Sequence, residues 1–278
     1  KTEETAFSGA VALRIGGEHV HQQACGYADM SNRVPNTLTT RFATASGTKF
    51  VTALSVGVLI DSGVLSLSSK IFDVIDADFP TYSRDITIEH LLTHTSGIPD
   101  YFDEELVDDF DNFEVAVPWH HMRGPRDYFP VFPRTSMKSD PGERFSYSNS
   151  GFILLGAAVE AVSGESFQEF ATSRVLLPVG MKSSGFFAFD RLPENTANGY
   201  IKDDNGYRTN IYSLPIVGAS DGGMFSTVSD IEALWDGFWN GAVITPGLVE
   251  QFAEKHVSAE PEGSRKHYGG GLWIDHQQ

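Results

Sequence analysis

The chain has 278 residues, which is enough for one large domain or two closely associated ones with a substantial hydrophobic core. Its formal net charge of −17, from 20 basic and 37 acidic residues, argues against binding to nucleic acid or to an anionic membrane surface. Cys25 is the only cysteine, which excludes an internal disulfide and a metal site built from several cysteines.

The first predicted element is a β-hairpin. Residues 7–15 and 19–28 read as two strands, and the glycines between them favour a tight turn. A helix is predicted next, from about Ser46 to Gly63, and its uniform hydrophobicity places it at the centre of the fold. Residues 42–60 approach the length of a membrane span, but their hydroxyls, glycines and internal lysine favour a buried helix, so we expect no membrane insertion.

Helices dominate the middle of the chain, and capping signals mark their starts. Helical patterns occupy 87–97 and 151–164, and further helices begin after 166 and 227. Between them, 100–144 is irregular and aromatic, and its acidic part, 100–114, is interpreted as a solvated loop or helix face. The tail from His267 onward reads as a strand.

Strands at both ends and helices between them predict an α+β fold. We expect a sheet domain made of residues 1–62 and 215–278, with a helical domain, 63–214, inserted between its two parts.

Ser46 and Lys49 form the one S-x-x-K motif in the chain. Three residues apart on a helix, the two side chains lie on one face. At a helix start, free N–H groups and the helix dipole favour developing negative charge, so Ser46 is a plausible nucleophile. A lysine in apolar surroundings loses its proton more readily, so Lys49 could be the base. The alternative is a packed lysine stem with its ammonium in water.

Tyr147 and Asn149 form a second polar motif. Tyr147 is the one tyrosine followed two residues later by asparagine. A phenol near an ammonium loses its proton more easily, so Tyr147 could be the general base for Ser46. Asn149 has both a donor and an acceptor, enough to hold Lys49 and a substrate carbonyl together. Taken alone, the pair could equally be a buried tyrosine and a helix cap.

Five segments in order resemble the landmarks of a known family, the penicillin-recognising serine hydrolases, in the branch that holds class C β-lactamases, DD-peptidases and family VIII-type carboxylesterases. They are FATASGTKFVTAL, LLTHTSGIPDY, PGERFSYSNSGFILLG, PVGMKSSGF and GGMFSTVSD. The resemblance implies a β-lactamase/transpeptidase-like fold, with an antiparallel sheet flanked by helices and an inserted helical domain. It also implies that Ser46 is acylated, that Lys49 and Tyr147 share the proton transfers, and that Asn149 orients substrate, with no cofactor.

The third motif of that family, a Lys or His followed by a small residue and Gly, is not clearly present. His267-Tyr268-Gly269 offers a poor match, because tyrosine occupies the middle position. We expect the motif, and the second oxyanion donor that it carries, to lie beyond Gln278. The substrate is a small molecule or peptide, but its class (β-lactam, D-amino peptide or ester) stays open at this stage. Trp119, Tyr128, Phe129 and Phe132 favour either an apolar acyl pocket or a small core of their own.

Other interpretations remain. Ser220 is the central residue of a G-x-S-x-G motif, the nucleophile elbow of α/β-hydrolases, although no strand–turn–helix pattern surrounds it. A non-catalytic, peptide-binding scaffold is a further alternative. His19 with His21, and His120 with His121, are weak metal signals, and we predict no metal site. We expect a periplasmic or extracellular location, with a cytoplasmic one as the alternative.

Overall fold

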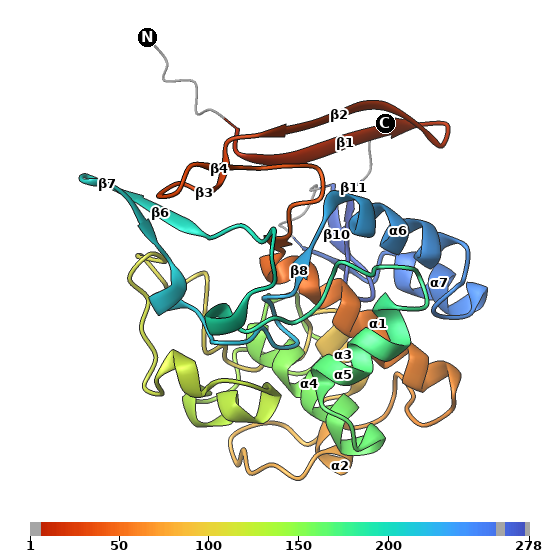
Figure 1. Cartoon of the computed structure of the whole chain (residues 1–278). Helices are drawn as coiled ribbons and strands as arrows, with labels where there is room; N and C mark the ends of the chain where they lie inside the picture. Colours follow the sequence, from red (N-terminus) through yellow and green to blue (C-terminus); the bar gives the residue numbers. More distant parts are fainter. Residues whose placement is uncertain (1–6, 260–264, 276–278) are drawn as a thin grey trace.

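A β-hairpin opens the fold. The computed structural model describes residues 7–259 and 265–275. Strands β1 (Gly9–Ile15) and β2 (Glu18–Cys25) pair antiparallel, and the turn between them uses two glycines in the left-handed region, so the predicted hairpin is confirmed. The hairpin lies across one side of the helical body (Figure 1). Arg14 and His19 tie it to helix α6 (Val228–Trp239) through Asp236 and Glu232, at 2.8 and 3.0 Å.

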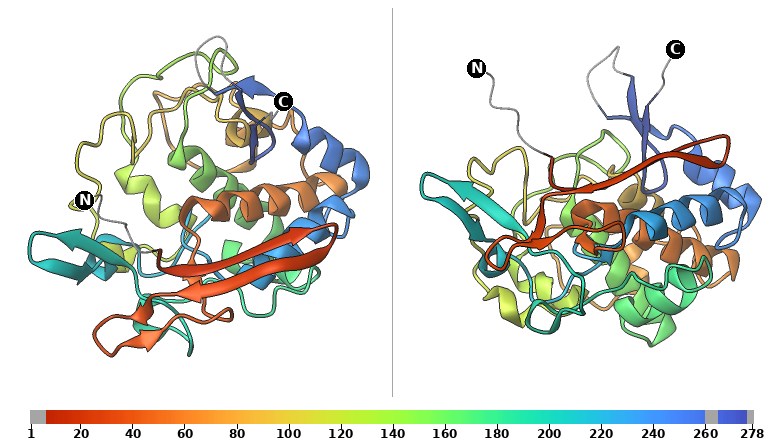
Figure 2. Two further views of the ribbon diagram at one scale, coloured as in Figure 1. Left: turned by 90° about the horizontal axis from the view of Figure 1, so that it is seen from above. Right: turned by 45° about the horizontal axis from the view of Figure 1, so that its top comes forward.

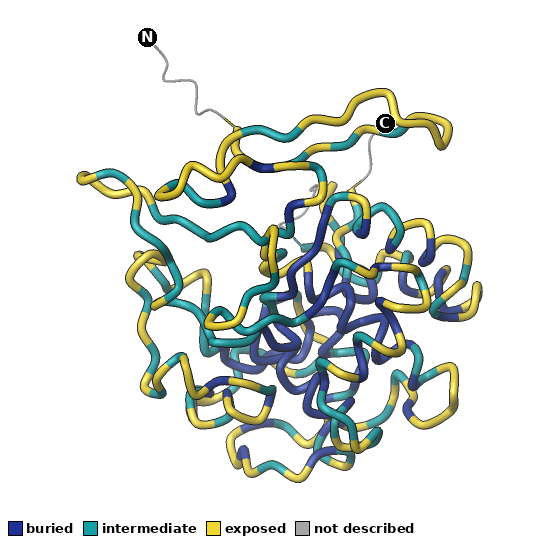
Figure 3. The backbone as a smooth tube through the Cα atoms, viewed as in Figure 1, coloured by how far each residue is buried: buried dark blue, intermediate teal, exposed yellow. Residues whose placement is uncertain are grey.

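Two hydrophobic helices form the centre of the molecule. Helix α1 (Thr48–Asp61) packs against α4 (Asn149–Ser163), and most residues of both are buried. Burial on every side explains why both sequences are apolar all round instead of amphipathic. Figure 3 shows the buried backbone concentrated in this helical body, while the hairpin is mostly exposed. The predicted glycine stops are confirmed at Gly63 and Gly164, which follow the two helices with φ of 74° and 72°. The third predicted stop, Gly97, is wrong, because the helix predicted over 87–97 already ends at Leu92.

The shorter helices begin where their capping residues predict. Thr87, Ser166 and Thr227 each accept a hydrogen bond from the backbone N–H three residues later. These three capping residues start α3, α5 and α6. The shorter helices are α2 (Ile71–Val74), α3 (Ile88–Leu92), α5 (Phe167–Ala171) and α7 (Pro246–Ala253), with single 3₁₀ or π turns at Ala45–Gly47, Trp119–His121, Pro125–Val131, Thr172–Leu176, Phe189–Arg191 and Ile211–Ser213.

Every strand pairing is antiparallel, but the described strands are divided among five small sheets. Besides the hairpin they are β3 (Tyr27–Asp29) with β4 (Val34–Pro35), β5 (Phe42–Ala43) with β8 (Phe225–Ser226), β6 (Tyr200–Asp203) with β7 (Gly206–Thr209), and β9 (Val257–Ser258) with β10 (Lys266–Tyr268) and β11 (Trp273–Asp275). The short β5–β8 pair joins the two predicted parts of the sheet domain, 1–62 and 215–278, but within the described residues the hairpin β1–β2 and the strands β9–β11 belong to separate sheets. Seen from above, α1 lies between the hairpin and the C-terminal strands (Figure 2).

The C-terminal segment differs from the prediction of a single strand. β10 and β11 pair with each other across a turn, in which the Gly269 N–H donates to the Leu272 carbonyl. The run of three glycines allows this sharp reversal. The prediction of one continuous strand is therefore wrong. Residues 276–278, which that prediction also included, lie outside the described residues.

No helix within the described residues is both long and apolar enough to cross a bilayer. The expected division into domains 1–62 with 215–278 and 63–214 stays a prediction. One hydrophobic cluster includes residues of both predicted parts, among them Leu54 of α1 and Leu155 of α4.

Candidate active site

Ser46 stands on a strained turn between β5 and α1. It belongs to a 3₁₀ turn, Ala45–Gly47, which leads directly into the helix, and it is exposed. Ala45, the residue before it, has φ of 44°, a left-handed conformation uncommon for a residue other than glycine. The turn presents the Ser46 hydroxyl to solvent at the N-terminal end of α1, close to where the sequence places it.

Lys49 lies beneath Ser46 and is 2% exposed. Its Nζ donates to the Ser46 hydroxyl at 3.1 Å, to Asn149 Oδ1 at 2.7 Å and to the Asp221 carbonyl at 2.8 Å. Three acceptors match the three hydrogens of an ammonium group. Two of the acceptors are carbonyl oxygens, which can only accept, whereas the hydroxyl can also donate. When Lys49 is neutral, its lone pair therefore faces the Ser46 hydroxyl.

Asp100 fixes the orientation of Asn149. Its carboxylate accepts the backbone N–H groups of Asn149 and Ser150, at 2.8 and 2.7 Å, and the Asn149 side-chain amide at 2.9 Å. The amide nitrogen of Asn149 therefore points to Asp100 and its oxygen to Lys49. Burial raises the pKa of Asp100, and the hydrogen bonds at the start of α4 oppose this rise. The solvated interpretation of the acidic stretch is wrong for Asp100.

Tyr147 lies beside Lys49 and contacts a buried histidine. Lys49 Nζ is 4.8 Å from the centre of the Tyr147 ring, and the ring of His94 is 4.3 Å from it, centre to centre. His94 Nδ1 also accepts the Ser148 N–H at 3.0 Å, so His94 contacts two adjacent residues of the motif. Burial, and secondarily the charge of Lys49, hold the pKa of His94 well below its ordinary value. His94 belongs to none of the motifs that were predicted to carry the chemistry.

Asp221 is the second buried carboxyl group at the site, and it is 7% exposed. The Tyr101 hydroxyl donates to its carboxylate at 2.5 Å, while its main-chain carbonyl accepts from Lys49. Burial raises the pKa of Asp221, and the nearby charge of Lys49 opposes that rise. The pKa of Tyr101 is also raised, by burial and then by the charge of Asp221.

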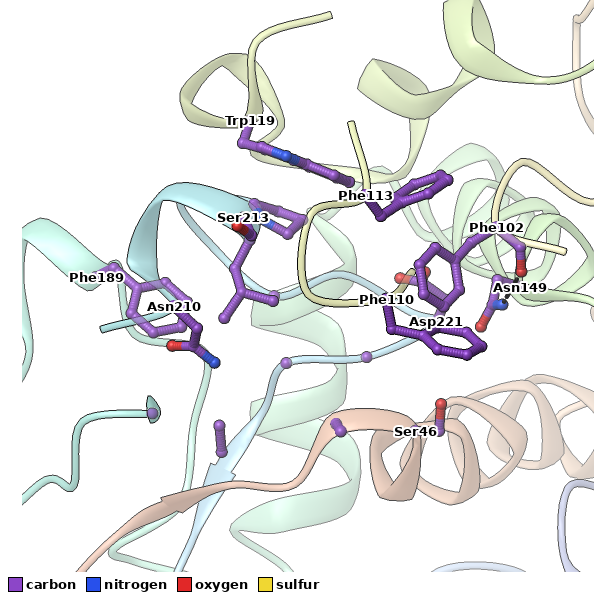
Figure 4. Close-up of a pocket in the computed structure, with 18 of the residues that line it drawn as sticks. Ser46, Phe102, Phe110, Phe113, Trp119, Asn149, Phe189, Asn210, Ser213 and Asp221 are labelled. Atoms are coloured by element: carbon purple, nitrogen blue, oxygen red, sulfur yellow. Dashed lines mark hydrogen bonds between the residues drawn. The ribbon is translucent and has the colours of Figure 1, made fainter. Parts of the chain in front are cut away.

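A pocket of about 460 Å³ opens beside Ser46. Figure 4 shows Ser46 and Asn149 at one end, Phe189 and Asn210 at the other, and aromatic side chains between them. These aromatic residues are Phe102, Phe110, Phe113 and Trp119. Both interpretations of the aromatic insert are correct in part. Tyr128 lines the pocket with Trp119, whereas Phe129 and Phe132 pack on Phe79 in the interior.

The structure contradicts the alternative nucleophile. Ser220 is 0% exposed, and its hydroxyl is buried without a hydrogen-bond partner. It faces Gly156 of α4 so closely that a Cβ at that glycine would lie 2.2 Å from Ser220 Oγ. A substrate carbonyl cannot reach this hydroxyl, because the helix covers it.

The weak third-motif match is not assembled at Ser46 either. Tyr268 is buried against His94 and Trp273, and the Gly269 N–H already bonds within its turn. The Gly269 N–H is therefore not free to stabilise an oxyanion. The position of the third motif beyond Gln278 stays a prediction.

The paired histidines do not form metal-ligand clusters in the described part of the chain. His19 bonds to Glu232, and the rings of His120 and His121 pack on each other at 4.3 Å. No group of three or more His, Cys, Asp or Glu side chains suited to a metal ion occurs among residues 7–259 and 265–275.

Comparison with known proteins agrees with this geometry. A sequence model of the Beta-lactamase family matches residues 2–278. The chain belongs to that family. It is 30% identical to "Penicillin-binding protein 4*" of Bacillus subtilis over 219 residues, which are 77% of this chain and 45% of that protein. The chain thus spans less than half the length of this relative.

Solved structures confirm the β-lactamase/transpeptidase-like fold. A penicillin-binding protein from Bacillus halodurans is 43% identical, with a TM-score of 0.91 over 97% of this chain and 81% of that one. A D-amino acid amidase from Ochrobactrum anthropi, complexed with D-phenylalanine, is 24% identical, with a TM-score of 0.78 over 96% of this chain and 76% of that one. The second similarity concerns the fold alone.

Proposed function

We propose that the protein is a serine hydrolase that forms an acyl-enzyme on Ser46. The observation that carries this proposal is the hydrogen bond between an exposed serine and a buried lysine whose other two acceptors are fixed carbonyl oxygens. That arrangement leaves the lysine one partner with which a proton can be exchanged.

In the acylation step, Ser46 Oγ attacks the substrate carbonyl carbon. The proton of the Ser46 hydroxyl is taken up by Lys49 and Tyr147, which share its transfer. The oxyanion forms near the Ser46 N–H, at the start of α1, where the helix dipole stabilises negative charge. Collapse of the tetrahedral intermediate breaks the bond to the leaving group, which takes up the proton. Water then attacks the ester on Ser46, delivers a proton back through the same groups and releases the acid.

Asn149 holds this arrangement in place. Its oxygen is bonded to Lys49, and its amide nitrogen is bonded to Asp100 and to the Phe102 carbonyl, at 2.9 and 3.1 Å. Asn149 thereby restricts the position of the ammonium, and it lines the pocket close to where a substrate amide would lie. We assign it the role of positioning Lys49 and the substrate.

The substrate is an amide or an ester with an apolar acyl group. The pocket beside Ser46 is rich in aromatic side chains, which favours carboxylic esters and peptides over compact polar substrates. Relatives named as penicillin-binding proteins support β-lactams and D-amino peptides as further candidates. Rates on an aryl butyrate, a chromogenic cephalosporin and a D-alanyl peptide, measured side by side, will rank these classes.

Labelling with a fluorophosphonate tests the nucleophile. Peptide mapping is expected to place the adduct on Ser46, and Ser46→Ala is expected to abolish labelling. Ser220→Ala serves as the matched control, because Ser220 is covered by α4 and should label like the unmodified protein. An adduct on any other residue would overturn the assignment.

A further inference from the structure

The pocket beside Ser46 contains a buried acidic group in aromatic surroundings. Among the described residues that line it, Asp221 is the only one with a charged side chain. No ion pair joins this carboxylate to a cation in that part of the chain, and Lys49 bonds to its main-chain oxygen instead. The Tyr101 hydroxyl donates a hydrogen bond to this carboxylate, and a further donor that carries a positive charge would stabilise its ionised form.

The aromatic side chains also suit a positive charge. Phe102, Phe110, Phe113 and Trp119 line the pocket, and Phe102 and Phe110 lie beside Asp221 (Figure 4). The faces of such rings attract ammonium groups, more strongly where water is excluded. The carboxylate and the rings therefore favour the same kind of ligand group, an amine in its protonated form.

The loop that supplies three of these rings is strongly acidic. Residues 100–114 contain eight Asp or Glu residues and no Lys, Arg or His. Only part of this charge is neutralised in the structure, since Lys138 pairs with Asp103 and Glu105, at 3.0 and 3.3 Å. Acidic side chains on a loop that also lines the pocket raise the local concentration of positively charged substrates.

The position of Asp221 relative to the nucleophile restricts where the amine stands in the substrate. Ser46 and Asp221 line the same pocket, and Lys49 Nζ bonds both the Ser46 hydroxyl and the main-chain oxygen of Asp221. An α-amine is about 2.5 Å from the carbonyl carbon of the same amino acid. An amino acid attached to Ser46 through its carbonyl would therefore keep its amine close to Ser46, inside the pocket that Asp221 also lines.

We propose that Asp221 and the surrounding rings bind the free ammonium group of an aminoacyl substrate. The preferred substrates are then amides and esters of amino acids, or peptides, whose unblocked amine is next to the cleaved bond. This proposal rests on the proposed function, because it assumes acylation of Ser46. It makes Asp221 a residue that determines specificity, separate from the proton transfers.

A pair of substrates tests the proposal. Phenylalanine p-nitroanilide, in both enantiomers, is compared with 3-phenylpropionyl p-nitroanilide, which lacks only the amine. At a pH that keeps the amine protonated, kcat/KM for one enantiomer should exceed that for the analogue by about 10- to 100-fold, the range of a charge-assisted hydrogen bond. In Asp221→Asn the ratio should fall toward one, whatever the absolute rate on the analogue becomes.

Asp73→Asn, an exposed change on α2, is the matched control and should leave the ratio unaltered. Equal cleavage of both substrates by the unmodified protein would overturn the proposal, as would an equal loss on both in Asp221→Asn. If neither substrate is cleaved and no reagent labels Ser46, the proposed function itself is wrong.

A second measurement needs no variant. Benzylamine, as its cation, should slow fluorophosphonate labelling of Ser46, whereas benzyl alcohol at the same concentration should not. Equal protection by both compounds would show a merely apolar pocket and would contradict the role of Asp221.

Discussion

Replacing His94 by asparagine should change how the stability of the protein depends on pH. His94 is buried, and its pKa lies well below the ordinary value of about 6.5 because of burial and the charge of Lys49. The unfolded chain therefore takes up a proton near pH 6.5 that the folded protein refuses, so acid favours the unfolded state. The stability contributed by the neutral ring is present above about pH 6.5 and is lost as the pH falls toward the folded pKa.

When the unfolded chain binds one proton more than the folded protein, the free energy of unfolding falls by about 1.4 kcal/mol for each pH unit of acidification. The expected loss of stability is about 2 kcal/mol between about pH 7.5 and about pH 5. Asparagine tolerates the left-handed conformation of residue 94, φ 55°, and carries no titrating group. Urea unfolding across this pH range should show a flatter curve for His94→Asn, whatever its absolute stability. His21→Asn, at an exposed position on β2, is the control. Parallel curves for His94→Asn and the unmodified protein would refute the reasoning.

Three further substitutions test the site. Lys49→Ala and Tyr147→Phe should each slow acylation by about 10²-fold or more, the range of general-base catalysis. Because both residues serve one proton path, the double variant should be far less impaired than the product of the two single effects. Losses that multiply, measured by stopped-flow labelling, would contradict a shared role. Asp100→Asn should lower the free energy of unfolding by about 3 kcal/mol, since it replaces a charged acceptor of N–H groups at the start of α4 by a group that also donates. An unchanged urea midpoint would mean that these hydrogen bonds contribute little.

Local signals in the sequence predicted the local parts of the structure well. Ser46 and Lys49 are one helical turn apart, and Thr87 and Thr227 are followed by the helices that they cap, so short-range rules were sufficient. The β1–β2 hairpin belongs to the same class, because two glycines in a short turn determine its pairing.

The missed residues come together from distant parts of the chain. Asp100 acts on Asn149, 49 residues later, and Asp221 meets Tyr101, 120 residues earlier. No spacing rule relates such positions, and Asp100 looked like one more charge in an acidic stretch. At the G-x-S-x-G motif, the pattern singled out Ser220, whereas the neighbouring Asp221 faces the pocket. The chain reverses tightly here, with the Ala219 N–H donating to the Gly222 carbonyl, so neighbouring side chains point in different directions, which a motif of letters does not record.

The left-handed conformation of Ala45 has a consequence for evolution and engineering. A methyl group in that conformation costs on the order of 1 kcal/mol, and glycine would avoid this cost. The same turn aims the Ser46 hydroxyl, and a glycine there would give the loop access to other shapes. Selection for heat resistance alone should therefore favour Ala45→Gly, whereas selection for turnover should restore alanine. Thermal stability and catalytic rate thus favour different residues at this one position.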